Sequence, residues 1–266
     1  ARDTVAALYA QGIRMEQKPF AVGVRIEHPR IWIDRAQYGA AAGHPALGAA
    51  DYKLVTHLPS GRGVYTFCMC PGGTVIAAAS EEGGLVVNGM SEFAREAVNS
   101  NSALLVGVSP ADFPDAHPLS GITLQRQMER AAFTLGGGQY RAPVQLVGDF
   151  LRGRASSGAG GVIPSYRPGV TWCDLTDCLP PFVSASLREA IPQFGHRLRR
   201  FDDHDAVLTG VESRSSSPVR ILRDENGEAS LSGVYPCGEG AGYAGGITSA
   251  AVDGIHCAEW VLAHPR

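Results

Sequence analysis

The sequence predicts a protein that mixes helices and strands, in the α+β or α/β class, and three patterns along the chain support this. Up to about residue 110, short β-rich runs alternate with glycine-containing breaks, which is typical of a sheet or a partly closed barrel. From 115 to 201, apolar residues recur mainly at helical spacing. After 205 strand-like runs return, and the chain closes with a glycine-rich loop and a helix over 246–263.

The individual elements follow from local periodicity and turn signals. Val5, Leu8 and Tyr9 predict an opening helix over 2–11, with Gly12 as its C-terminal cap. The expected helices farther on cover 123–135, 144–151 and 182–191. The expected strands cover 20–27, 52–56, 63–70, 74–78, 84–87, 102–108, 206–211, 219–223 and 230–235. The last two flank Asn226-Gly227, a pair suited to a tight hairpin turn.

Composition excludes several classes of partner. The 266 residues are 44% hydrophobic and 18% charged, a balance typical of soluble globular proteins. A net charge of −3 gives no electrostatic reason for binding nucleic acid or an anionic membrane. No stretch approaches the roughly 18 apolar residues of a membrane span. We therefore expect a cytoplasmic protein with no nucleic-acid or membrane partner, and the missing initiator Met predicts excision from a longer polypeptide.

The six cysteines predict reduced thiols rather than a disulfide framework, because the chain is long and shows no secretory signal. The spacings Cys68-x-Cys70 and Cys173-x₄-Cys178 do not match the Cys-x-x-Cys pairs of zinc sites. The histidines show no metal-binding spacing either. We expect no metal site.

The closing loop carries the clearest motif. Gly240, Gly242 and Gly245 fit G-x-G-x-x-G, the dinucleotide fingerprint. That fingerprint requires a following strand with an acidic residue about 20 positions on, whereas the sequence ends within the closing helix. We therefore interpret the loop as belonging to the last strand-loop-helix unit of a sheet rather than to the first.

Such a loop suits a flavin. Glycines let the backbone approach a ligand where a Cβ would clash, and Glu239 can accept hydrogen bonds from ribityl hydroxyls. The amino end of the closing helix presents unpaired N–H groups and partial positive charge. Directed at the flavin pyrimidine edge, these groups would stabilise the negative charge of the reduced ring.

At these residues the chain resembles a known family, the uncharacterised FAD-dependent dehydrogenases among the two-dinucleotide-domain flavoproteins (NAD(P)/FAD-dependent oxidoreductases). The resemblance covers nearly the whole chain and is strongest at 18–29, 50–53, 65–73, 164–166, 211–221 and 238–247. It implies an oxidoreductase that passes hydride or electrons through FAD to or from a small substrate. NAD(P) is a second candidate cofactor.

The resemblance also implies a layout and a set of site residues. Residues 1–21 and 205–266 would belong to a Rossmann-like FAD domain, and 22–204 to an inserted substrate domain with strands to about 110 and helices over 115–201. The implied cofactor-binding residues are Gly238, Glu239, Gly240, Ala241, Gly242, Gly245, Gly246 and Ile247. The family's amino-terminal fingerprint is absent here, so its partner would be a missing amino-terminal segment of the same parent chain. We accordingly expect the isolated chain to bind FAD weakly or not at all, and to be inactive by itself.

The catalytic residue is not determined by the sequence, which offers Cys68, Cys70 and Arg220 as candidates. On a strand, Cys68 and Cys70 would face one way, either as thiols beside the flavin or, as we favour, as small buried residues. The segment from Ser215 to Arg220 would present hydroxyls and a guanidinium to the isoalloxazine or to an acidic substrate; it fits a polar loop entering a strand equally well.

Two other functional classes stay open. The chain could be a non-catalytic substrate-binding or interaction domain that keeps a flavoprotein fold without the cofactor. A thiol-redox protein using Cys68 and Cys70 is the third hypothesis, which the Cys-x-Cys spacing disfavours.

Overall fold

The computed structural model describes residues 2–263 and divides them into two compact units. Unit 1 contains the stretch up to Ala21, the segment Val108–Gln125 and the chain from Arg214 onward. Unit 2 contains Val22–Gly107 and Arg126–Ser213. Each unit is thus assembled from segments far apart in the sequence, and each is described below by itself.

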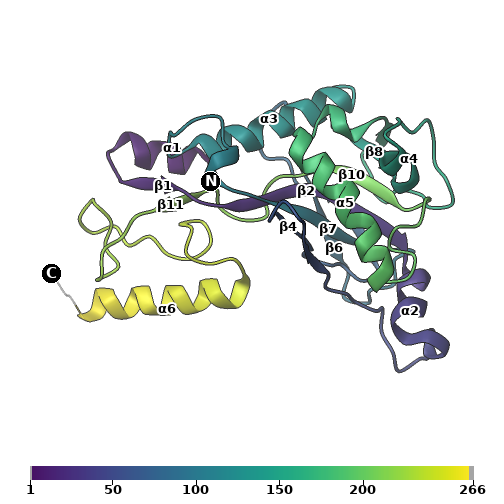
Figure 1. Ribbon diagram of the computed structural model, residues 1–266. Coiled ribbons are helices and arrows are strands. Elements are labelled where there is room, and N and C mark those ends of the chain that lie inside the picture. The colour runs from purple at the N-terminus through teal and green to yellow at the C-terminus, as the bar shows by residue number, and fades with distance from the viewer. Residues whose placement is uncertain (1, 264–266) are drawn as a thin grey trace. The chain divides into compact units, whose positions relative to one another are not determined.

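The helices and strands are labelled in Figure 1. The helices are α1 (Arg2–Ala10), α2 (Arg30–Tyr38), α3 (Ser120–Leu135), α4 (Val147–Arg152), α5 (Pro181–Arg197) and α6 (Ile247–Ala263), with short 3₁₀ turns at Gly39–Ala41, Pro110–Asp112 and Leu175–Asp177. The strands are β1 (Met15–Gln17), β2 (Phe20–Pro29), β3 (Val55–His57), β4 (Gly63–Thr66), β5 (Gly73–Ala77), β6 (Val87–Ser91), β7 (Asn99–Val108), β8 (Ala142–Leu146), β9 (Val170–Trp172), β10 (Val207–Glu212) and β11 (Val219–Ile221).

Unit 2 is built on a seven-stranded sheet with the order β3-β4-β7-β2-β10-β8-β9. β2 pairs antiparallel with β10, whereas β8 and β9 are parallel, so the sheet is mixed. The predicted mixture of helices and strands is therefore confirmed. β2 and β7 are the long central strands, and they are buried along almost their whole length.

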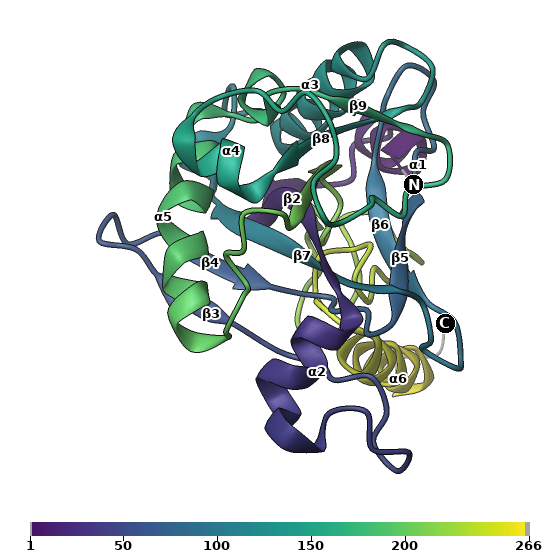
Figure 2. The same cartoon turned by 90° about the vertical axis from the view of Figure 1, so that its right-hand side faces the viewer.

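The two faces of this sheet are covered differently (Figure 2). On one face lies α5, whose Val183, Leu187 and Phe194 are buried at helical spacing. On the other lies the antiparallel β5–β6 hairpin, which brings Gly89 against the guanidinium of Arg25. Because side chains alternate along a strand, β2 directs Arg25 and Glu27 toward the hairpin face.

Unit 1 has a smaller core. β1 and β11 form a two-stranded antiparallel ladder, and Ile13, Met15, Ile122, Val219, Ile221 and Ala241 are buried around it. Of the described side chains of α6, only Cys257 is buried, while Ile247, Ile255 and Leu262 are 93%, 59% and 78% exposed. α6 is therefore an apolar helix of which little is covered.

Several sequence-based predictions were wrong in detail. The predicted helix over 144–151 begins as strand β8, and β9 also lies in the stretch expected to be helical. Val144 pairs with both Thr209 and Trp172, so tertiary pairing decides the conformation of a short apolar run that periodicity cannot classify. The helix α2 was missed altogether.

The predicted strand over 230–235 is also absent, so the glycine loop follows irregular chain rather than a strand. Asn226-Gly227 does form a tight turn, with Arg223 and Ala229 bridged across it. The ladder ends there because the chain folds back on itself, with Ala229 N–H donating to Val234 O. Backbone groups that a strand would pair with a neighbouring strand are instead hydrogen-bonded within this local turn.

Candidate functional site

The glycine loop, residues 236–246, is anchored to α6 by an ion pair within unit 1. Arg223 donates from both terminal nitrogens to Asp253 of α6, at 2.7 and 3.0 Å, and also to the carbonyl of Pro236. Asp253 accepts a third hydrogen bond from the Gly238 amide at 2.8 Å. These hydrogen bonds lower the pKa of Asp253, and the bond from Arg223 has the largest effect. The carboxylate therefore stays ionised and fixes the start of the loop.

Aromatic rings complete this anchor. The Arg223 guanidinium carbon lies 3.6 Å from the centroid of Tyr243 and 4.9 Å from that of Trp260. Tyr243 in turn donates its hydroxyl to the carbonyl of Ile221 on β11. The Arg223 guanidinium thus contacts two aromatic rings, one from the loop and one from α6.

The glycines of the motif have different local surroundings. Gly242 has a φ of +90°, and a Cβ there would lie 2.6 Å from the Val219 carbonyl oxygen. Gly238 also has a positive φ, of +73°. Gly240 and Gly245 are exposed, and a Cβ on either would meet nothing within 4 Å. Gly242 is therefore required by the close approach to β11, whereas Gly240 and Gly245 leave the loop surface open.

The other predicted cofactor residues also divide into buried and more exposed positions. The side chain of Ala241 is buried in the core of unit 1, and its carbonyl accepts from Ile221 N–H. Glu239 is half-buried and Gly246 intermediate, while Ile247 begins α6 in an exposed position. The first intrahelical bond runs from Ala250 N–H to Gly246 O. The preceding amides of the first turn have no acceptor within the helix.

The structure brings Arg220 and Ser217 to this loop. Arg220 Nε donates to Gly242 O at 3.3 Å, and its guanidinium also pairs with Glu16 at 3.5 Å. The hydroxyl of Ser217 donates to Gly240 O at 3.3 Å. Burial and then the charge of Arg220 lower the pKa of Lys18, whereas the charge of Glu239 opposes that shift. Charged groups of both signs therefore lie near the loop.

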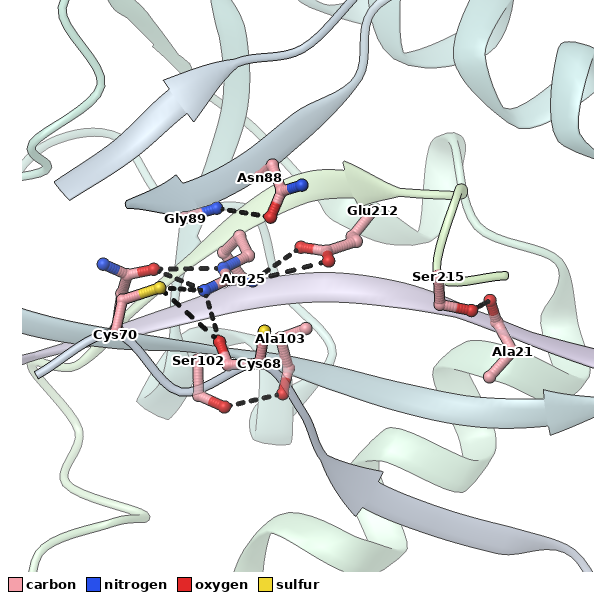
Figure 3. Close-up of polar contacts among 11 residues, drawn as sticks. Ala21, Arg25, Cys68, Cys70, Asn88, Gly89, Ser102, Ala103, Glu212 and Ser215 are labelled. Carbon is pink, nitrogen blue, oxygen red and sulfur yellow. Dashed lines mark hydrogen bonds and ion pairs between the residues drawn. The ribbon is translucent and has the colours of Figure 1, made fainter. Parts of the chain in front are cut away.

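A second polar cluster lies in unit 2 around Arg25, which is fully buried (Figure 3). Its guanidinium donates to Glu212 at 3.0 Å, to Asn101 Oδ1 at 2.7 Å, to the Cys68 carbonyl at 2.9 Å and to the Cys70 thiol at 3.4 Å. Burial raises the pKa of Glu212, and the positive charge of Arg25 counteracts part of that shift. Every nitrogen of the guanidinium has a partner, as a buried cation requires.

This cluster corrects the prediction for Cys68 and Cys70. β4 ends at Thr66, so the two cysteines are not on a regular strand and do not face one way. Cys68 is exposed, whereas Cys70 is buried and bridges to Asn101 of β7. Burial raises the pKa of Cys70 despite the neighbouring Arg25. The buried structural interpretation therefore fits Cys70 and not Cys68.

Sequence reasoning missed the buried charges themselves. Glu27, two residues after Arg25, accepts from the Ser165 hydroxyl at 2.5 Å and from Asn99 at 3.1 Å. Burial raises the pKa of Glu27. The signal was available: charges at alternate positions of an otherwise apolar strand, 20–27, indicate a polar layer on one face.

Among residues 2–263, no group of three or more His, Cys, Asp or Glu side chains is arranged to hold a metal ion. Within the same residues, no helix combines the length and the hydropathy that crossing a bilayer would need.

Comparison with known proteins identifies a relative and a family. An uncharacterized protein of Clostridium beijerinckii (strain ATCC 51743 / NCIMB 8052) is 53% identical over 263 residues, which are 98% of this chain and 49% of that protein. The chain therefore spans about half the length of this relative. The model of the family described as "FAD-dependent protein, C-terminal domain-like" matches residues 19–215. This range contains the Arg25 cluster and not the glycine loop, and by this match the chain belongs to that family of FAD-dependent proteins.

Proposed function

We propose that the chain is the carboxy-terminal part of an FAD-dependent oxidoreductase that transfers hydride or electrons to or from a small substrate. Family membership over 19–215 is the observation that carries this proposal. When bound, the flavin would supply the redox chemistry, and the protein would supply binding, orientation and electrostatics. Residues 1–21 and 205–266 would contribute to a Rossmann-like FAD domain, with 22–204 inserted as a substrate domain.

The glycine loop supports a location for the cofactor. Gly240 and Gly245 leave open space where other residues would place a Cβ, so no side chain closes the loop at these positions. Glu239 is half-buried and could accept hydrogen bonds from a polyol chain. The first-turn amides of α6 could donate to an electron-rich ring edge. These residues fit the ribityl chain and the isoalloxazine of a flavin.

Roles for the remaining residues follow from their placement. Arg220 donates a hydrogen bond to Gly242 O and would place a positive charge beside the isoalloxazine ring. In this proposal it is a positioning residue. Gly238, Gly242 and the Ala241 backbone would keep the loop in shape rather than touch the ligand. NAD(P) would serve as an electron donor or acceptor, and the activity would be that of a cytoplasmic dehydrogenase.

The experiment is flavin binding by the polypeptide that contains this chain, at its full encoded length. We expect protein-bound flavin absorbance, and bleaching of that absorbance by NADH or NADPH under anaerobic conditions. Gly240→Ala and Gly245→Ala should each weaken flavin binding at least tenfold, because a methyl group would occupy the ligand face without disturbing the fold.

Gly48→Ala is the matched control, since Gly48 is an exposed glycine of unit 2 whose Cβ would also meet nothing within 4 Å. Absence of any bound flavin in the full-length polypeptide would overturn the proposal. Equal flavin affinity in all three variants would mean that the cofactor does not bind at this loop.

A second candidate function is a non-catalytic binding or interaction domain, which the exposed apolar residues of α6 favour. Exposed apolar surface of this kind marks a site of association. In the first proposal the partner of α6 is an amino-terminal FAD-binding segment of the same parent chain. If Ile255→Asp disrupts association with a separately produced amino-terminal segment while flavin never binds, the interaction domain is the better description.

A further inference from the structure

Two cysteines of unit 1 lie near the anchor that holds the glycine loop. Cys237 is an exposed residue of the loop, and Cys257 is a buried residue of α6. Cys257 lies one helical turn after Asp253, so both side chains point from the same face of α6. That face contacts the loop.

Hydrogen bonds on either side of Cys237 hold it against that face. The Cys257 thiol donates to the carbonyl of Tyr235 at 3.6 Å, two residues before Cys237. The amide of Gly238, one residue after Cys237, donates to Asp253 at 2.8 Å. The loop is thus pinned to α6 immediately before and immediately after Cys237.

The thiols also interact with each other. Burial raises the pKa of Cys257, and the neighbouring Cys237 raises it further. By charge, Cys68 raises the pKa of Cys70 and Cys173 raises that of Cys178. Because Tyr235 and Gly238 both hydrogen-bond to the face of α6 that carries Asp253 and Cys257, the chain at Cys237 is held beside Cys257.

From this geometry we infer that Cys237 and Cys257 form a site of reversible oxidation, at which a disulfide ties the glycine loop covalently to α6. A disulfide needs its sulfurs to approach to about 2.05 Å. Cys237 is an exposed loop residue and can supply this movement. The disulfide chemistry does not depend on a bound flavin; only its effect on the cofactor rests on the proposed function.

With hydrogen peroxide as oxidant, the steps balance. The accessible Cys237 thiol loses its proton, and its thiolate attacks one peroxide oxygen. The O–O bond breaks, the leaving hydroxide takes up that proton, and a sulfenic acid and one water result. The Cys257 sulfur then attacks the sulfenic sulfur, the S–O bond breaks, and the second water leaves with the thiol proton. Overall, two thiols and one peroxide give one disulfide and two waters, with two electrons passing from sulfur to oxygen. A dithiol reductant reverses the change by exchange.

The bond would have a local structural consequence. It would close the chain from 237 to 257, which contains Glu239, Gly240, Gly245 and the first turn of α6. In the proposed function these are the residues beside the flavin, so oxidation would alter flavin affinity without touching Arg25 or the sheet of unit 2.

The test is peptide mapping by mass spectrometry of the full-length polypeptide, after treatment with a few equivalents of hydrogen peroxide and alkylation of the remaining thiols. We expect a 237–257 linked peptide, loss of two alkylatable thiols, and full recovery of both after incubation with dithiothreitol. Cys237→Ser should abolish the link while retaining the buried Cys257 that the fold uses.

Cys68→Ser is the matched control, because Cys68 is also exposed and also has a buried cysteine neighbour. It should leave the 237–257 link unchanged. A wild-type map in which Cys237 is oxidised to sulfinic acid with Cys257 still alkylatable would overturn the inference, as would a dominant 68–70 link. If the link forms in a polypeptide that never binds flavin, the inference stands and the proposed function fails.

Discussion

The Arg25 cluster of unit 2 and the glycine loop of unit 1 handle charge in contrasting ways. Around Arg25, each nitrogen of a fully buried guanidinium has a partner within the protein. In the glycine loop, the Arg223–Asp253 pair is only slightly exposed, at 11% and 14%, and next to it the surface at Gly240 is open. The difference is that the charges around Arg25 are enclosed and fully paired within the protein, whereas the paired charges of the glycine loop lie beside open backbone, where we propose that the flavin binds.

The largest effect should come from breaking the buried pair. Glu212→Ala leaves Arg25 buried without its carboxylate and should lower the free energy of unfolding by about 3–5 kcal/mol. Urea unfolding monitored by circular dichroism measures this. Asp203→Asn, at the more exposed Arg200–Asp203 pair of the same unit, should cost less than about 1 kcal/mol. Equal losses in the two variants would mean that the Arg25 cluster contributes no more than a surface pair.

Acid should weaken unit 2 through His28. Its ring is fully buried, its Nε2 lies 2.8 Å from Phe201 O, and burial lowers its pKa to about 4. Because the folded pKa lies below the ordinary value of 6.5, the stability is complete above pH 6.5 and falls as the pH drops toward 4. Relative to His28→Gln, which does not titrate, wild type should lose about 3 kcal/mol over this range. Parallel pH profiles for both proteins would contradict this assignment.

The anchor of the glycine loop should respond at lower pH. The pKa of Asp253 is lowered by Arg223, so its contribution is present above the ordinary carboxyl value of 3.8 and is lost as the pH falls through the lower folded value. At neutral pH, Asp253→Asn should destabilise unit 1 by about 2 kcal/mol. Hydrogen exchange of peptides from 236–246 measures this locally, and peptides from the Arg25 strand should not change.

The smallest effect distinguishes two glycines within one motif. Gly242→Ala forces a methyl group toward the Val219 carbonyl at a φ of +90° and should cost about 1–2 kcal/mol. Gly240→Ala has open space and should change stability by less than about 0.5 kcal/mol. Thermal unfolding of the two variants tests this directly. The reverse order would mean that the loop surface at Gly240 is closed.

Local pattern was sufficient for much of the secondary structure. The sequence by itself predicted the mixture of helices and strands, the opening helix, the helix over 123–135 and the closing helix, because apolar spacing and capping residues are local signals. It also identified the glycine motif before α6. Val144 shows the limit, since the same short apolar run became a strand once Thr209 and Trp172 lay on either side of it.

Only the tertiary structure decided which of these residues act together. Arg25, Asn101 and Glu212 are far apart in the sequence, and strand order alone makes them neighbours. Loop folding, and not strand order, brings together Arg223, Gly238 and Asp253, whose hydrogen bonds fix the glycine loop. Periodicity determines which face of a helix or strand a side chain occupies. The pairing of distant segments determines which residues that face contacts, and no local pattern encodes that pairing.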